Sequence, residues 1–132
     1  MTVGQDPMDA VRRYFGSLDD GDFEGVVECF TEDVFYSHPA FLSEPPGSPR
    51  HELTGRAALR AYLAQRGFRT SRHRLDAEAV AGNKGFISGV TLDEDGRPRA
   101  SFVAEMIFAD GLIRSYAAYI SLPPVGPGFG RT

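Results

Sequence analysis

The spacing of apolar residues changes near residue 72, and this change constrains the fold more than any other feature of the chain. In the predicted helices before it, apolar residues recur every three or four positions. After it, they follow the alternation typical of strands. Four strand-like runs, separated by short turns, cover residues 72–81, 85–93, 99–109 and 112–121. Because short turns join antiparallel strands, this half of the chain predicts an antiparallel meander.

The start of the chain predicts two helices. Helical spacing over residues 6–18 places Tyr14 on the buried face of the first helix. Asp22 follows the turn-forming sequence DDG and is a good N-terminal cap for a second, short helix that buries Val26 and Phe30. The single cysteine, Cys29, lies on this apolar face, where we expect it to pack as a small hydrophobic side chain.

A short strand, a loop and a third helix are expected next. Residues 34–38 are rich in β-branched and aromatic side chains and end before a proline, which predicts a strand with His38 at its end. Residues 42–53 contain three prolines and a glycine, so they predict a loop that is either open or closes over a site as a lid. Thr54 would cap the third helix, which stops at Gly67.

Composition favours one soluble domain. The chain has 132 residues, 42% of them hydrophobic, which suffices for one core, and we expect a domain over residues 1–122 and a Pro/Gly-rich tail over residues 123–132. The net charge of −4 argues against nucleic acid as a partner, because such binding requires basic residues. Asp6 and Asp9 stand where a secretory signal would be basic and apolar, and no segment approaches the roughly 20 apolar residues of a membrane span. We therefore expect a cytoplasmic protein without a membrane partner.

No sequence motif points to a metal or a cofactor. His38, His51 and His73 lack the close spacing of metal ligands, and the lone cysteine adds no second site. The sequence contains no GxSxG, no phosphate-binding glycine loop and no dinucleotide fingerprint. We therefore expect neither a metal nor a cofactor.

Strand alternation over residues 101–108 sets a carboxylate among apolar neighbours. One face carries Ser101, Val103, Glu105 and Ile107, and the other carries Phe102, Ala104, Met106 and Phe108. A carboxylate in such surroundings is costly unless it is paired or protonated. Glu105 is therefore either the ion-pair partner of Arg74 or Arg114, or an acid that its site keeps neutral for catalysis. The apolar stripe of the other face would lie outside and mediate a homodimer.

Two further side chains are candidates for chemistry. An unperturbed histidine can accept a proton at neutral pH, and His38 stands where a strand meets a loop. Taken alone, a histidine in such a place is more often structural or exposed. Tyr14 either fills core space with its ring or offers its hydroxyl to a partner.

The element order and three segments of the sequence resemble a known family. The segments are VRRYFGSLDDGDFEGVVECFTEDV, HPAF and TGRAALRAYL. Over about residues 8–122 the chain resembles the SnoaL-like branch of the nuclear-transport-factor-2-like (NTF2-like) superfamily, and most of all ketosteroid isomerase. The resemblance implies a cone-shaped, cystatin-like α+β fold, in which three N-terminal helices pack on a curved, mostly antiparallel sheet that encloses an apolar pocket. The superfamily includes isomerases, cyclases, dehydratases, epoxide hydrolases and binding modules.

The resemblance to ketosteroid isomerase also implies a site. In that family a tyrosine and a protonated acid form an oxyanion hole, and an aspartate moves the proton. The tyrosine corresponds to Tyr14, the oxyanion acid to Glu105 and the proton-moving aspartate to His38. Two positions differ from that family: a histidine replaces the aspartate, and Leu63 replaces a hydroxyl on the third helix. These differences favour related chemistry on a different substrate. The aspartates of limonene-type epoxide hydrolases have no counterparts, which disfavours epoxide opening.

The same register implies the walls of a pocket for a hydrophobic small-molecule ligand. These walls are mostly apolar or aromatic and comprise Phe15, Phe30, Phe41, Leu59, Tyr62, Leu63, Phe86, Ser88, Val90, Val103, Tyr116, Ala118 and Ile120. Such walls suit a flat or polycyclic ligand with few polar groups.

Two hypotheses of function follow. The first is a small acid–base enzyme of isomerase, cyclase or dehydratase type that enolises a hydrophobic polyketide- or steroid-like carbonyl compound. His38 would be its base, and Tyr14 with protonated Glu105 would hold the enolate oxygen. In a variant of this hypothesis, Glu105 stays ionised and orients His38. The second hypothesis is a non-catalytic ligand-binding or dimeric assembly module of the same fold.

Overall fold

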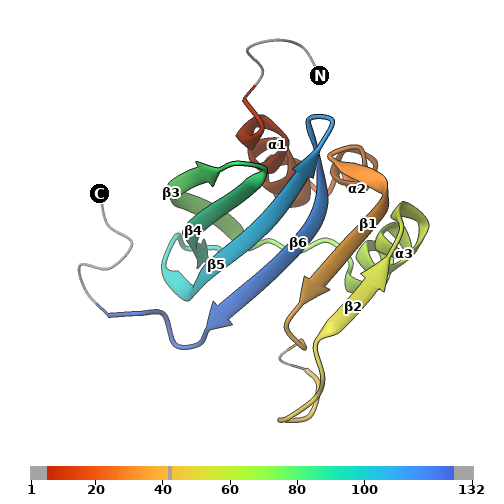
Figure 1. The fold of residues 1–132 in the computed structure, drawn as a ribbon. Coiled ribbons are helices and arrows are strands. Elements are labelled where there is room, and N and C mark those ends of the chain that lie inside the picture. Colours follow the sequence, from red (N-terminus) through yellow and green to blue (C-terminus); the bar gives the residue numbers. More distant parts are fainter. Residues whose placement is uncertain (1–5, 42, 127–132) are drawn as a thin grey trace.

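A curved six-stranded sheet with helices against one face forms the protein (Figure 1). The computed structural model describes residues 6–41 and 43–126, so residue 42 of the predicted loop and residues 127–132 of the predicted tail lie outside the described part. In chain order the elements are α1 (Met8–Asp19), α2 (Phe23–Val27), β1 (Phe30–His38), β2 (His51–Thr54), α3 (Arg56–Arg66), β3 (Arg72–Ala81), β4 (Lys84–Leu92), β5 (Pro98–Ala109) and β6 (Leu112–Ser121).

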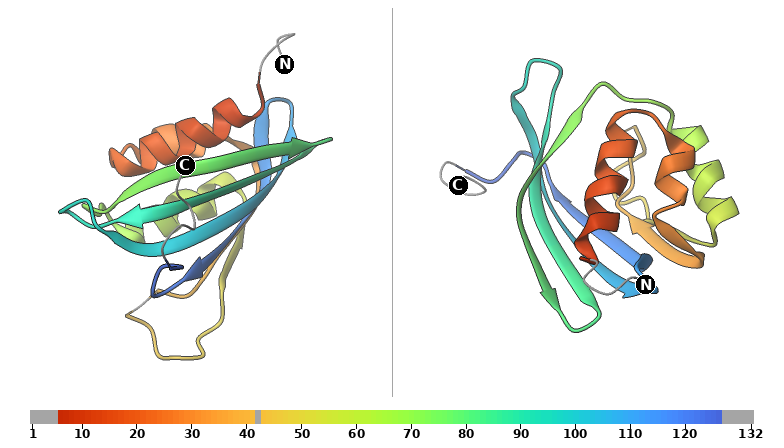
Figure 2. Two further views of the ribbon diagram at one scale, coloured as in Figure 1. Left: turned by 90° about the vertical axis from the view of Figure 1, so that its left-hand side faces the viewer. Right: turned by 90° about the horizontal axis from the view of Figure 1, so that it is seen from above.

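The sheet is mixed, because one of its strand pairs is parallel. The strand order is β2-β1-β6-β5-β4-β3, and the meander β3 to β6 is antiparallel throughout, as predicted. β1 pairs in parallel with β6 and sets Tyr36 opposite Tyr116. A parallel pair requires a long connection between its strands, which here contains β2, α3 and the first three strands of the meander, β3 to β5. Figure 2 shows the helices on the same side of the curved sheet. The α+β class is therefore confirmed.

Turn chemistry explains the meander. Between β4 and β5 the carboxylate of Asp93 accepts hydrogen bonds from the backbone N–H groups of Asp95 and Arg97, both at 2.9 Å. A side chain that binds its own turn in this way favours reversal of the chain. Between β5 and β6, Asp110 and Gly111 have φ angles of 55° and 77°, the positive values that a tight hairpin turn requires.

The helices follow the apolar spacing of the sequence. Residues buried on one face of α1 are Met8, Val11, Tyr14, Phe15 and Leu18. The carboxylate of Asp22 accepts a hydrogen bond from the backbone N–H of Gly25 at 3.0 Å and caps α2, as predicted. The helix α3 ends at Arg66 and is followed by Gly67, as predicted.

Two local predictions around β2 are wrong. Residues His51–Thr54 form β2, which pairs antiparallel with the end of β1, so the predicted loop over residues 42–53 ends before His51. The last proline of this segment is residue 49, and the backbone N–H groups beyond it are free to pair. Thr54 lies in β2 opposite Phe35, and Gly55 with a φ of 94° therefore precedes α3 in its place.

The predicted inner and outer faces of β5 are interchanged. Four residues predicted to face outward are buried in the core: Phe102, Ala104, Met106 and Phe108. In contrast, Val103 and Glu105 are exposed. The reason lies in β4, where a Cβ at Gly85 would stand 2.6 Å from the Phe108 ring and a Cβ at Gly89 would stand 2.7 Å from the Phe102 ring. The two aromatic rings fill the space that these glycines leave, which fixes their face of β5 inward.

The predicted homodimer through the outer sheet face stays a prediction, but the residues available for it change. The stripe that was to mediate it is buried, and the large apolar side chains on the outer face are instead Phe35, Phe86, Val103 and Tyr119. Each is at least 39% exposed. A strict monomer in light scattering at micromolar concentration would contradict this dimer.

Neither a membrane helix nor a metal cluster is found in the described part of the chain. Within residues 6–41 and 43–126, no helix combines the length and the apolar character that crossing a bilayer requires. Over the same residues, no three His, Cys, Asp or Glu side chains gather closely enough to hold a metal ion.

The contact between β4 and β5 can be tested by Gly89→Ala. The added methyl would stand 2.3 Å from the carbonyl oxygen of Arg74 as well as against the Phe102 ring, so we expect the free energy of unfolding to fall by about 1–3 kcal/mol in urea titrations. Gly16→Ala is the matched control, because a methyl added at this position of α1 would have no atom within 4 Å. This control should gain roughly 0.5–1 kcal/mol from helix propensity. Equal stability of Gly89→Ala and the parent would contradict the packing account.

Candidate active site

Two adjoining hollows lie between the helices and the inner face of the sheet. The inner cavity, of about 40 Å³, is lined by Tyr14, Phe15, Leu18, Tyr36, His38, Tyr62, Arg66, His73, Thr91, Phe102, Tyr116, Ala118 and Ile120. A wider hollow of about 380 Å³, called the mouth below, is lined by His38, Pro39, Ala40, Phe41, Arg66, Arg69, Ser71, His73, Thr91, Arg99, Ala100, Ile120 and Leu122. The two share His38, Arg66, His73, Thr91 and Ile120, so they form one continuous site.

His38, the last residue of β1, stands between the inner cavity and the mouth. Its Nδ1 lies 2.9 Å from the carbonyl oxygen of Pro39. Because a carbonyl can only accept a hydrogen bond, Nδ1 carries the proton and Nε2 of the neutral ring keeps its lone pair. Burial, aided by the positive charges of Arg66 and Arg69, lowers the pKa of His38 from 6.5 to about 4. At neutral pH the ring is therefore a neutral proton acceptor.

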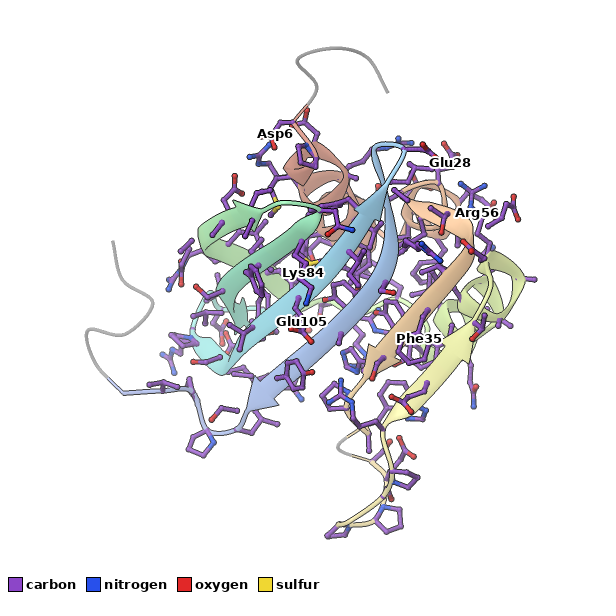
Figure 3. The ribbon with its side chains drawn as sticks, viewed as in Figure 1. Asp6, Glu28, Phe35, Arg56, Lys84 and Glu105 are labelled. Atoms are coloured by element: carbon purple, nitrogen blue, oxygen red, sulfur yellow. The ribbon has the colours of Figure 1, made fainter. Side chains whose placement is uncertain are left out.

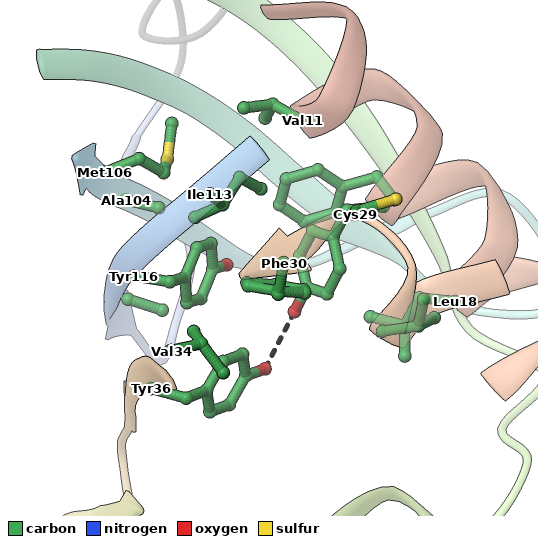
Figure 4. Close-up of a cluster of buried hydrophobic side chains, with 14 of the residues drawn as sticks. Val11, Leu18, Cys29, Phe30, Val34, Tyr36, Ala104, Met106, Ile113 and Tyr116 are labelled. Atoms are coloured by element: carbon green, nitrogen blue, oxygen red, sulfur yellow. Dashed lines mark hydrogen bonds between the residues drawn. The ribbon is translucent and has the colours of Figure 1, made fainter. Parts of the chain in front are cut away.

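Three tyrosines of the inner cavity supply hydroxyl groups. Tyr14 from α1, Tyr36 from β1 and Tyr116 from β6 are each at most 2% exposed. The hydroxyls of Tyr14 and Tyr36 share a hydrogen bond of 2.7 Å, drawn as the dashed line at Tyr36 in Figure 4, and Tyr36 stacks on Tyr116 at 5.0 Å between ring centroids. Burial raises the pKa of each tyrosine well above 10, so the three hydroxyls stay protonated. Tyr14 interacts through its hydroxyl with both Tyr36 and Tyr116. Two hydrogen bonds among three hydroxyls use two of the three O–H groups, so one O–H of the set remains available as a donor.

Tyr62 of α3 adds a fourth hydroxyl. Its oxygen is buried and has no hydrogen-bond partner among the described residues, although the side chain lines the inner cavity. Burial raises the pKa of Tyr62 to about 12. A buried hydroxyl without a partner costs stability, and a ligand oxygen in the cavity would remove that cost.

A second histidine of the site is held by a carboxylate. Nδ1 of His73 on β3 lies 2.6 Å from Oδ1 of Asp19 at the end of α1, and the backbone N–H of His73 donates to Oδ2 at 3.0 Å. The two side chains are only 14% and 13% exposed. Because a carboxylate only accepts hydrogen bonds, Nδ1 carries a proton, and Nε2 is the ring nitrogen that Asp19 does not engage.

The prediction that Glu105 faces the same site as Tyr14 and His38 is wrong. Glu105 is exposed and lines a shallow groove on the outer face with Phe35 and Lys84, and Figure 3 shows these three on the face away from the helices. Its carboxylate accepts a hydrogen bond from the hydroxyl of Tyr119 at 3.4 Å. The cause is the inward fixing of the aromatic face of β5, since strand alternation then turns Glu105 outward.

The other predicted wall residues fall into three groups. Phe15, Tyr62, Tyr116, Ala118 and Ile120 line the inner cavity, and Phe41 lines the mouth. Buried in the core are Phe30, Leu59 and Leu63. The placement of the remaining four on the inner wall is wrong, because Ser88, Val90 and Val103 line an outer groove and Phe86 is 39% exposed.

Sequence reasoning missed several residues of the site. Tyr36 could have been found, because it lies two positions before His38 on one strand and so shares its face. His73 lies two positions before Leu75, which packs against the core, so the two share a face of β3. Its partner Asp19 is 54 residues away and carries no local signal. Arg66 and Arg69 lie at and just beyond the end of α3, where they resemble ordinary surface residues of a helix terminus.

Comparison with known proteins assigns the chain to a family. The family model of the SnoaL-like domain matches residues 11–116. The chain belongs to the SnoaL-like family. No functionally curated protein matches the chain. The SnoaL-like fold of the chain is shared with many solved structures.

Three solved structures illustrate the shared fold. An NTF2-like protein of unknown function from Burkholderia xenovorans is 22% identical with a TM-score of 0.69, over 92% of this chain and 88% of that one. A candidate ketosteroid isomerase from Kribbella flavida is 23% identical with a TM-score of 0.66, over 91% and 83%. A candidate isomerase of the SnoaL-like family from Agrobacterium tumefaciens is 16% identical with a TM-score of 0.67, over 86% and 96%. At these identities the comparison shows the fold alone.

The lowered pKa of His38 predicts a pH dependence of stability. Between pH 6.5 and about 4 the unfolded chain protonates this histidine and the folded chain does not, so the free energy of unfolding falls as the pH drops through this window. The full contribution is about 3 kcal/mol, from the shift and about 1.4 kcal/mol per pH unit. Urea titrations of the parent and His38→Asn between pH 7 and pH 4 measure it, since the variant should lose less stability over that range. If the free energy of unfolding depended on pH identically in the parent and in His38→Asn, the lowered pKa of His38 would be contradicted.

Proposed function

We propose that this SnoaL-like chain is a small acid–base enzyme that enolises a hydrophobic carbonyl compound, as an isomerase, cyclase or dehydratase of polyketide- or steroid-like ring systems does. One observation carries the proposal: a neutral histidine and a set of protonated tyrosine hydroxyls line the same inner cavity. Enolisation requires this combination, because one group must accept a proton from carbon while another stabilises the charge that forms on oxygen.

The proton transfer uses His38 as the base. Nε2 takes a proton from the carbon next to the substrate carbonyl, the electron pair of the broken C–H bond moves into the C–C bond, and the carbonyl oxygen becomes an enolate oxygen. The imidazolium then returns the proton to another carbon for isomerisation. For dehydration it gives the proton to a leaving hydroxyl, which departs as water. For cyclisation the enolate carbon attacks a second carbonyl, and the oxygen of that carbonyl takes the proton from the imidazolium. The three reactions share the first step, in which the hydrogen-bonded set of Tyr14, Tyr36 and Tyr116 donates its spare O–H to the enolate oxygen.

Charge around the cavity favours the enolate over the ground state. Among the described residues, no carboxylate lines the inner cavity or the mouth, whereas Arg66 lines both and Arg69 lines the mouth. Their positive charges disfavour protonation of His38 while the site is empty. Once negative charge develops on the substrate, it stabilises the imidazolium and is itself stabilised by the arginines. The attraction of the arginines and the imidazolium for the substrate oxygen is therefore stronger in the transition state than in the ground state, which is the condition for catalysis.

The proposal is tested by exchange of α-protons in D2O. NMR follows the exchange with 2-tetralone, a flat ketone, and the protein should accelerate it above the buffer rate. His38→Ala should lose at least about 100-fold of this acceleration. Tyr14→Phe should lose about 10-fold. His73→Gln tests the second histidine and should retain more activity than His38→Ala. Glu105→Gln is the matched control, because the carboxylate lies on the outer face, and it should exchange at the parent rate.

An unchanged exchange rate in His38→Ala would favour a non-catalytic binding function. If His38→Ala and the parent exchange α-protons at the same rate while the ketone still binds, the site holds ligands without acid–base chemistry. The chain would then be a ligand-binding module, and the exposed apolar side chains of the outer sheet face would support a role in assembly. A loss of exchange in Glu105→Gln would contradict the assignment of the site to the inner face.

A further inference from the structure

Three arginines surround the mouth without a carboxylate partner among the described residues. Arg66 ends α3, Arg69 follows it and Arg99 lies on β5, and all three line the mouth. Within residues 6–41 and 43–126, none of the three forms an ion pair, whereas six other arginines pair with Asp or Glu: Arg12, Arg13, Arg56, Arg60, Arg72 and Arg74. In a chain with a net charge of −4, unpaired positive charge is thus gathered at the opening that leads to His38.

The geometry of the mouth keeps these charges close to one another. Burial and repulsion from Arg66 and Arg99 lower the pKa of Arg69, whose guanidinium lies 5.2 Å from the centre of the Phe41 ring. Like charges held together at a rim repel one another, and a bound anion would relieve the repulsion. The wall beside them is apolar, with Phe41, Ile120 and Leu122. The mouth therefore combines donors for an anion with a surface for a ring.

We propose that the mouth binds the carboxylate of an aromatic or polycyclic acid, and that the substrate of the proposed enolisation belongs to this class, an inference that rests on the proposed function for its catalytic part only. The guanidinium groups bind the carboxylate through charge-assisted hydrogen bonds. The ring lies against the apolar wall, and its carbonyl extends past His38 toward the tyrosine hydroxyls. An aromatic carboxylate matches both the arginines and the apolar wall of the mouth, whereas an inorganic anion would leave the apolar wall without a contact.

The experiment compares an acid with its neutral isostere. Calorimetric titration of 1-naphthylacetate and 1-naphthylacetamide should give about tenfold or more tighter binding of the acid in about 20 mM salt, a preference that falls several-fold in about 500 mM salt as the charges are screened. Arg66→Gln, Arg69→Gln and Arg99→Gln should each weaken acid binding about 3- to 10-fold and leave amide binding nearly unchanged. Circular dichroism of each variant checks that the fold is intact.

Arg114→Gln is the matched control, because this exposed arginine on β6 does not line the mouth and should leave the preference for the acid unchanged. Equal affinities for acid and amide, no binding of either, or the same loss in Arg114→Gln would overturn the proposal. Binding of inorganic phosphate as tight as that of the acid would also overturn it, because charge alone would then explain the site. His38→Ala should keep the preference for the acid, so a failure of the proposed chemistry leaves this readout unaffected.

Discussion

The packing of the aromatic rings of β5 into the gaps left by two glycines of β4 decides which face of the sheet carries the site. The rings of Phe102 and Phe108 fill the space at Gly89 and Gly85, and both rings are buried. Because side chains alternate along a strand, Glu105 must then lie outside. β6 pairs with β5 so that Tyr116 lies opposite Met106, and both side chains are buried. The chemistry of the cavity is therefore that of histidine and tyrosine, and not that of a carboxylate.

Desolvation sets the protonation states of the cavity. The same burial that makes His38 reluctant to gain a proton makes Tyr14 and Tyr36 reluctant to lose one, because a charged form is disfavoured in both cases. The result at neutral pH is an acceptor and a donor that are both uncharged, set within one small space. A substrate that develops negative charge there meets fixed hydroxyl dipoles, with Arg66 as a cation in the cavity lining. Little reorganisation is then required during the reaction, which is how a preformed polar site lowers a barrier.

Local signals in the sequence predicted the elements well and the site only in part. The meander, the Asp22 cap and the stop of α3 at Gly67 depend on neighbouring residues, and all are confirmed. The orientation of β5 was predicted wrongly because the resemblance to ketosteroid isomerase placed Glu105 at the site, although the face with Phe102 and Met106 is the more apolar one. The complementary information lies on another strand, at Gly85 and Gly89, and becomes visible only when the two strands are paired. The pairing of His73 with Asp19 is equally non-local.

The measurement that tests the account most directly is a crystal structure of the protein with 2-naphthol, a stable mimic of an enol. The account predicts that its hydroxyl oxygen lies in the inner cavity at about 3 Å from the hydroxyl of Tyr14, Tyr36, Tyr62 or Tyr116. It also predicts that the ring carbon next to that oxygen faces Nε2 of His38. A ligand found instead on the outer face beside Glu105, or in the mouth with its oxygen turned away from the tyrosines, would contradict the central claim.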